Sequence, residues 1–307
     1  MNENTTTYVP TPEEFAFRPQ DPTRWEQAEA VSGGKHDFAK RFFSGKLNIL
    51  GLVILALLVL SAILIPIIGP DFNAQHLDAT NLSPSGAHWF GTDTLGRDMF
   101  SRCFMGLRVS LIIAAVATLI DLFIGMNYGI ISGYFGGTTD IIMQRVIDII
   151  GSIPTLVVVT LLMLVLEPGM GAIILALMLT GWIEMSLIAR SQVMRVKQME
   201  YIQAARTLGA GHFHIITKDI MPNIIGKLVT QIMISIPEAV FLEAFLSFIG
   251  LGMPAGTCSL GTLLSDGFNN ALLYPYKLIP AAVVMILLMC GSHLVSEGLK
   301  KSTGDVG

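Results

Sequence analysis

The sequence has few charged residues: they make up 14% of its 307 positions, whereas soluble domains carry about 25%. The net charge of −4 provides no excess of positive charge for binding nucleic acid, so no nucleic-acid partner is expected. Only three cysteines occur, Cys103, Cys258 and Cys290, and their spacing matches no zinc or redox motif. The residues therefore predict no metal site, and whether Cys103 and Cys258 pair stays open.

The sequence also lacks a phosphate-binding loop. Gly45-Lys46 and Gly226-Lys227 have neither the preceding glycine nor the following Ser or Thr that the G-x4-G-K-[ST] loop requires. No Ser/His/Asp or Cys/His grouping is recognisable, and His212 and His214 are interpreted as surface or docking residues. We expect no catalytic residue, no bound cofactor and no ATP hydrolysis by this chain.

Apolar residues are abundant instead: they make up 52% of the chain, and the mean hydropathy is +0.63. A spanning helix needs about 20 predominantly apolar residues. The pattern predicts an all-α polytopic membrane protein with six transmembrane helices, at about 47–68, 107–131, 141–166, 171–190, 228–250 and 278–298.

The distribution of Lys and Arg predicts the orientation. Six lie between the N-terminus and Lys46, six lie between positions 190 and 227, and Lys300 and Lys301 lie at the C-terminus. Cytoplasmic loops are enriched in these residues. We expect both termini and the 191–227 insert to be cytoplasmic in a multi-pass membrane protein.

The spans also predict the domain organisation. Residues 1–37 are polar and lack the apolar core of a signal peptide, and we expect a disordered cytoplasmic tail. Residues 38–106 are expected to form an interfacial helix, the first span and an external segment. Residues 107–299 form the core domain, and 300–307 a cytoplasmic tail.

Residues 201–223 form a polar, basic insert between two apolar segments. Gln203-Ala204-Ala205 favours a helix, and Gly209 favours a sharp turn. Helical spacing then resumes, and Pro222 is expected to end it. Such a helix–turn–helix fits a partner's groove, although an inert amphipathic loop is the competing interpretation.

Acidic and small residues interrupt the predicted spans. Small residues flank Asp121 at four-residue steps, including Gly125 and Gly129, and this spacing favours close helix packing. Acids inside a membrane are costly and often line a water-filled path. Asp121, Glu238 and Glu243 are therefore candidates for helix packing or for lining a path.

The external stretch 69–105 contains two acid–base pairs at helical spacing, Asp93 with Arg97 and Asp98 with Arg102. Thr92 or Asp93 is expected to cap a short helix there. A second short helix or re-entrant segment is expected between residues 251 and 277.

The insert resembles the coupling loop of membrane subunits of ABC importers, E-A-A-x3-G followed by L-P. Ala204, Ala205, Gly209 and Pro222 match this pattern, and Gln203 replaces the usual Glu. The motifs FGTDTLGRD, GYFGGTTDIIMQRVIDIIGSIP and FLEAFLSFIGLGMP resemble the dipeptide/oligopeptide/nickel branch and its C-type permease. The resemblance covers about residues 38–299 and implies the type I ABC importer transmembrane fold.

The resemblance implies a multi-pass permease of the bacterial cytoplasmic (cell) membrane that forms half of a translocation path for dipeptides or oligopeptides. It implies a homologous second permease, two cytosolic ATPase subunits that use ATP and Mg, and an external substrate-binding lipoprotein. Gln203, Ala204, Ala205, Gly209 and Pro222 are the residues it implies for coupling to the ATPases.

Three alternatives stay open. The cargo could be nickel or a metal chelate, although the spans contain no His before His293. A secondary transporter using Asp121 or Glu238 as a proton site is a second alternative, but no internal repeat is visible. A non-transporting scaffold is the third.

Overall fold

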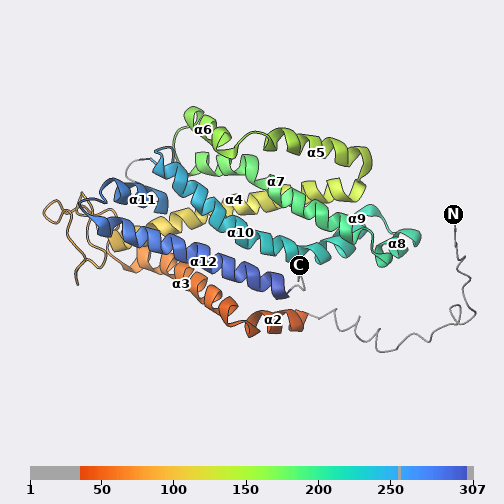
Figure 1. Cartoon of the computed structure of the whole chain (residues 1–307), viewed down its shortest axis with the longest axis horizontal. Coiled ribbons are helices and arrows are strands. Elements are labelled where there is room, and N and C mark those ends of the chain that lie inside the picture. The colour runs from red at the N-terminus through yellow and green to blue at the C-terminus, as the bar shows by residue number, and fades with distance from the viewer. Residues whose placement is uncertain (1–34, 255–256, 303–307) are drawn as a thin grey trace, which may run out of the picture.

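The computed structural model describes residues 35–254 and 257–302, and over these ranges the chain forms helices, turns and loops without a β-sheet (Figure 1). The predicted tails lie outside the described residues up to residue 34 and from residue 303. The elements are α2 (Lys35–Ser44), α3 (Lys46–Ile68), α4 (Met99–Phe135), α5 (Gly137–Gly151), α6 (Thr155–Val165), α7 (Met170–Val196), α8 (Glu200–Thr207), α9 (His212–His214), the π-helix η2 (Ile215–Ile220), α10 (Met221–Phe248), α11 (Leu260–Asn269), the 3₁₀-helix η3 (Pro275–Lys277) and α12 (Leu278–Ser302).

Five continuous helical runs are long and apolar enough to cross a membrane: α3, α4, α7, the run from α9 to α10, and the run from η3 to α12. The bent pair α5 and α6 makes six if it counts as one span. The predicted all-α, membrane-spanning fold is therefore confirmed.

The third predicted span, 141–166, is not one straight helix. α5 and α6 meet at an angle of 71°. Pro154 has no amide hydrogen and disfavours helical geometry at Ile153, so α5 ends at Gly151 and α6 begins at Thr155.

α4 is longer than the predicted span 107–131. Its 37 residues correspond to about 55 Å, so it projects beyond a hydrocarbon core of about 30 Å. The helix begins where the Asp98 carboxylate accepts a hydrogen bond from the Ser101 amide, at 2.9 Å. Asp98 is therefore the N-cap, and the predicted capping of a separate helix by Thr92 or Asp93 is wrong.

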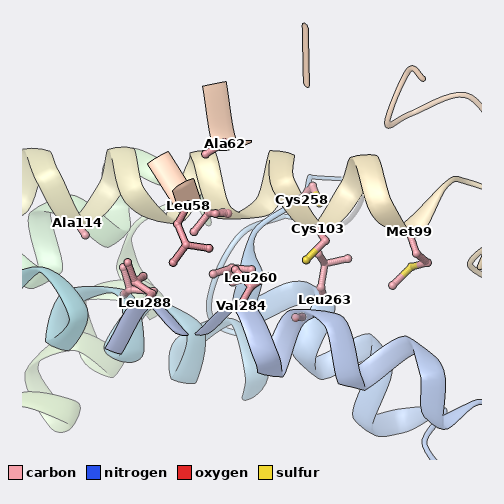
Figure 2. Close-up of a cluster of buried hydrophobic side chains, with 13 residues drawn as sticks. Leu58, Ala62, Met99, Cys103, Ala114, Cys258, Leu260, Leu263, Val284 and Leu288 are labelled. Carbon is pink, nitrogen blue, oxygen red and sulfur yellow. The ribbon is translucent and has the colours of Figure 1, made fainter. Parts of the chain in front are cut away.

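The helices pack around α4, which contacts α7 most extensively, and α3 packs on α12. One buried cluster joins α3, α4, α11 and α12; Figure 2 shows Leu58, Cys103, Leu260 and Val284 of these four helices facing one another. A second buried cluster joins α4 and α7 to the segment from α8 to α10.

The bundle has two distinct ends in Figure 1. α2, α8 and the C-terminal end of α12 lie at one end, called the α8 end below. α11 and the loop 69–98 lie at the other, called the α11 end. The chain thus runs from the α8 end through α3 and returns to the same end through α12.

Candidate functional site

The turn after α8 has the geometry that the Gly209 position requires. The Ala210 amide donates to the Ala205 carbonyl, and the Gly209 amide donates to the Arg206 carbonyl, both at 3.0 Å. These two bonds form a Schellman motif, in which the glycine adopts a left-handed conformation. Gly209 has φ +82°, which side-chain-bearing residues rarely adopt.

Two large apolar side chains flank this turn and are exposed. Leu208 is 88% exposed and Phe213 is 80% exposed. Gln203 and Ala204 are exposed on α8, and Ala205 is half-buried. The turn therefore exposes two large apolar side chains, which the sequence pattern did not single out.

The inner face of the same segment is fixed to the bundle. Ile202 of α8, Ile215 and Ile220 of η2 and Ile224 of α10 are fully buried. They belong to the cluster that includes Val193 of α7. The inner face of the segment is therefore packed closely against α7 and α10.

Polar contacts add to this attachment. Tyr134 Oη at the end of α4 forms a 2.8 Å hydrogen bond with His212 Nδ1. The Arg206 guanidinium lies 5.2 Å from the centroid of the Tyr134 ring, within reach of a cation–π interaction. His212 thus contacts α4 of the same chain. Tyr134 also belongs to the site, but it lies in an apolar stretch of sequence and was not predicted to do so.

The side-chain amide of Gln203 forms a hydrogen bond to the end of α7. Its Nε2 donates to the Lys197 carbonyl at the end of α7, at 3.1 Å. Lys197 Nζ in turn donates to the carbonyls of Gly133 and Tyr134, at 2.8 and 3.1 Å. An ionised Glu at position 203 could not donate to a carbonyl oxygen, so the departure from the family pattern matches this local contact.

Pro222 does not end a helix, contrary to the prediction. It lies in the first turn of α10, and the helical run continues from His212 to Phe248. The six residues before α10 form the π-helix Ile215–Ile220, whose i→i+5 pattern differs from that of an α-helix.

The candidate acids occupy two different environments. Asp121 is buried and lines a cavity of about 210 Å³ with Glu184 and Glu238, both of which are exposed. Glu243 is fully buried, and its carboxyl group accepts hydrogen bonds from Ser110 and Ser247, at 2.7 and 2.9 Å. Glu243 therefore packs α10 against α4, whereas Asp121 and Glu238 lie together.

The small residues of α4 lie against α7. A Cβ atom at Gly125 would lie 2.5 Å from the Trp182 carbonyl oxygen, and one at Gly129 would overlap the Ser186 carbonyl. Only glycine permits this approach of the two backbones. The close contact holds Asp121 beside Gly181 on α7.

At the α11 end, the observed ion pairs agree only in part with those that the sequence spacing predicts. Arg97 Nε donates to Asp93 at 2.7 Å, as expected, but Arg102 also lies 3.5 Å from Asp93. Asp98 pairs with His88 at 3.0 Å, so the expected Asp98–Arg102 pair is wrong. A tight turn brings Asp93 back toward α4, and Asp98 is already occupied as its N-cap.

The short helix expected between 251 and 277 is α11, which begins with a capping box of Ser259 and Thr262. Asp266 of α11 lines a hollow with Arg97 and Arg102. Burial raises the pKa of Asp266, while Arg102 and Arg97 act to lower it. Cys103 and Cys258 are both buried free thiols in the structure.

Comparison with known proteins adds family matches to this geometry. Residues 125–301 match the binding-protein-dependent transport system inner membrane component, and residues 35–84 match the N-terminal TM domain of oligopeptide transport permease C. The oligopeptide transport system permease protein OppC of Bacillus subtilis (strain 168) is 43% identical over 86% of this chain and 87% of that protein.

Other relatives agree. The dipeptide transport system permease protein DppC of the same organism is 42% identical over 86% of this chain and 83% of its own. A solved inward-facing structure of the MetNI methionine ABC transporter aligns with a TM-score of 0.57 at 16% identity. It covers 67% of this chain and 97% of that one, and the likeness shows a shared fold.

The helical bundle and the matched regions define a membrane-spanning permease subunit of a transport system. The chain belongs to the family of binding-protein-dependent transport system inner membrane components, as a C-type permease of the branch indicated by its motifs. It is an integral protein of the cytoplasmic membrane.

Proposed function

We propose that this chain is the permease of an ATP-driven, binding-protein-dependent peptide importer, in which it forms half of the translocation path. Its relatives are permeases of oligopeptide and dipeptide transport systems, which supports peptide as the cargo. Its partners are a homologous permease, two ATPase subunits that use ATP and Mg, and an external binding lipoprotein. This chain supplies no catalytic residue to ATP hydrolysis.

The turn between α8 and α9 is the element that docks on an ATPase subunit. The observation that carries this role is the exposure of Leu208 and Phe213 on a turn whose inner face is buried. Two large apolar side chains exposed on one short turn favour a protein contact. The rigid Schellman turn presents both without further ordering.

The same segment transmits movement of the ATPases to the path. α8 follows α7, and the run from α9 continues without interruption into α10. Displacement of the turn therefore displaces α7 and α10, which both line the cavity containing Glu184 and Glu238. Closure and opening of the ATPases alternate the path between its two sides, because the docked turn has different contacts in the two states.

The α8 end is the cytoplasmic end in this proposal. α2, the α8 segment and the C-terminal end of α12 lie together at that end (Figure 1), and each carries Lys or Arg. This grouping is the one the positive-inside rule favours. Both termini then lie in the cytoplasm, and the α11 end meets the binding protein.

The test is reconstitution of the four-subunit transporter with its binding protein in proteoliposomes. The double variant Leu208→Ser, Phe213→Ser removes both apolar side chains. Burial of a Leu or Phe side chain contributes about 1.5–3 kcal/mol, and 1.4 kcal/mol corresponds to about tenfold in affinity. We expect at least a tenfold loss of ATPase association and of ATP-dependent peptide uptake, with pairing of the permeases retained.

Leu272→Ser is the matched control, since this side chain is 101% exposed at the α11 end. It removes one exposed leucine side chain from the opposite end of the bundle, and ATPase association should be unchanged. Normal ATPase association and uptake in the double variant would contradict the docking role. A wild-type complex that imports no peptide would contradict the cargo assignment.

A further inference from the structure

A cavity of about 210 Å³ lies among the spans, and six of its ten lining residues are polar or acidic. It is bounded by α4, the start of α6, α7 and α10. The lining residues are Asp121, Thr155, Leu177, Thr180, Gly181, Glu184, Ser235, Glu238, Ala239 and Leu242. Three of the ten are acids, and none of these described lining residues is basic.

Asp121 is the unusual member of this lining. The residue is only 8% exposed, and Oδ1 is buried without a hydrogen-bond partner among the described residues. A carboxylate held in this way is costly, because water and protein donors are both withheld from it. An acid that only packed helices together would have a donor, as Glu243 does in Ser110 and Ser247.

The bundle keeps room for the Asp121 carboxylate. A Cβ atom at Gly181 of α7 would collide with Asp121 Oδ2, so the absence of a side chain there makes the space. Gly125, one turn along α4, brings α7 close enough for this arrangement. The Asp121 carboxylate therefore occupies a space that Gly181 leaves open.

The other two acids stand at the open side of the cavity. Glu184 and Glu238 are exposed and are close enough to interact electrostatically. Among the described residues, no three His, Cys, Asp or Glu side chains form a group that could hold a metal ion. The three acids therefore present separated negative charges, which suit a ligand carrying hydrogen-bond donors and a positive charge.

We propose that this cavity is a transit subsite for a primary ammonium group of the transported peptide. The inference rests on the proposed function, since it requires a peptide in the path. An ammonium group has three donors, which can face the Asp121 carboxylate, Glu238, and Thr180 or Ser235 in this lining. Exposed acids at the rim attract the cation and hold it weakly, so the peptide is released onward.

Saturation-transfer NMR titrations on the complete permease–ATPase complex in nanodiscs test this subsite, with the binding protein omitted. The probes are trialanine, N-acetyl-trialanine, and N-acetyl-Ala-Lys-Ala. We expect Asp121→Asn to weaken trialanine binding about tenfold and to leave N-acetyl-trialanine binding unchanged. Asp78→Asn, the same change at an exposed acid of the loop 69–98, should alter neither.

The third probe separates two sources of the ammonium group. If its binding also depends on Asp121, the subsite accepts lysine side chains; if it does not, the subsite is restricted to the peptide N-terminus. Either result supports recognition of an ammonium group when trialanine binding depends on Asp121.

Glu238→Gln is a second variant, to be used if Asp121→Asn fails to assemble. Glu238 is exposed at the rim of the cavity, so its substitution should not disturb folding. It should weaken trialanine binding and spare N-acetyl-trialanine. Equal binding of free and acetylated peptide by the wild type, or an unchanged preference in both variants, would overturn the inference. Peptide uptake by the wild type is measured separately, so failure of the importer assignment is distinguishable from failure of the subsite.

Discussion

Ser110 of α4 donates a hydrogen bond to Glu243 of α10, with the two oxygen atoms 2.7 Å apart and both residues fully buried. The same hydroxyl accepts from the Leu260 amide at the start of α11, at 3.2 Å. Ser247 donates to the second oxygen of Glu243. One carboxyl group therefore joins two spans to the helix at the α11 end.

Replacing Glu243 tests this junction. Glu243→Ala leaves two buried hydroxyl groups without their acceptor, and each unsatisfied group costs about 1–3 kcal/mol. We expect a marked fall in the thermal unfolding temperature of the purified complex. Glu243→Gln keeps a carbonyl acceptor and should lose less.

The control is Glu297→Ala, at an exposed acid paired with Lys301 on α12. A surface pair of this kind contributes roughly 0–1 kcal/mol. Equal unfolding temperatures for Glu243→Ala and Glu297→Ala would show that the buried junction does not stabilise the bundle.

The turn after α8 provides a matched pair of glycines. A methyl group at Gly209 or at Gly211 would meet no atom within 4 Å, but only Gly209 has a positive φ, +82°. Gly209→Ala should therefore cost about 1–2 kcal/mol through the backbone alone. We expect several-fold less peptide imported per ATP hydrolysed, with Gly211→Ala close to wild type. Identical transport by the two variants would refute a need for the left-handed turn.

A second pair of glycines tests the contact between α4 and α7. Gly129→Ala places a methyl group against the Ser186 carbonyl and should destabilise the complex by about 1–3 kcal/mol, as overpacking does. Gly151→Ala adds the same methyl group where no atom lies within 4 Å. It should be neutral or slightly stabilising, because alanine favours a helix over glycine. The measurement is the thermal unfolding temperature, monitored by tryptophan fluorescence. Equal unfolding temperatures for Gly129→Ala and Gly151→Ala would contradict the prediction.

Sequence patterns predicted what depends on local order. The apolar segments indicated the spans, and the spacing of Gly125 and Gly129 indicated close packing because both follow the helical repeat. The turn at Gly209 was predictable for a similar reason, since glycine adopts positive φ at little cost.

Contacts that depend on chain reversal were not predictable from spacing. Asp98 and Arg102 have helical spacing, but the chain becomes helical only at Met99, so Asp98 caps the helix and Arg102 turns toward Asp93. Pro222 looked like a terminator because its place in the first turn of a new helix depends on the preceding π-helix. The contact of Tyr134 with His212 joins residues 78 positions apart, which no local pattern encodes.

Burial also controls thiol chemistry at the α11 end. Desolvation raises the pKa of the Cys258 thiol to about 11, and its Sγ donates to the Arg102 carbonyl at 3.0 Å. At pH 8 roughly one molecule in a thousand would carry the reactive thiolate, three units below this pKa. We expect slow alkylation by N-ethylmaleimide that rises about tenfold per pH unit up to pH 10. Rapid labelling of Cys258 at pH 7 in the folded complex, followed by mass spectrometry, would contradict this.

The unreactive buried cysteines allow a direct test of orientation. Cys103 and Cys258 are buried, so a Cys290→Ser background leaves little labelling by an impermeant maleimide. Leu208→Cys places an exposed thiol at the α8 end, and Leu272→Cys places one at the α11 end. In intact cells we expect labelling of Leu272→Cys alone, and in inside-out vesicles from cells without the ATPase subunits labelling of Leu208→Cys alone, because the membrane blocks the reagent.

The paired design makes the result decisive, since each variant serves as the other's control for expression and reactivity. The reverse pattern would place the α8 end outside the cell. The turn with Leu208 and Phe213 would then be unable to meet cytosolic ATPases, and the coupling role proposed for Gly209 would fall with it. Labelling of both variants in intact cells, together with leakage of a cytoplasmic marker, would identify damaged cells, and the assay would be repeated in sealed spheroplasts to restore the contrast.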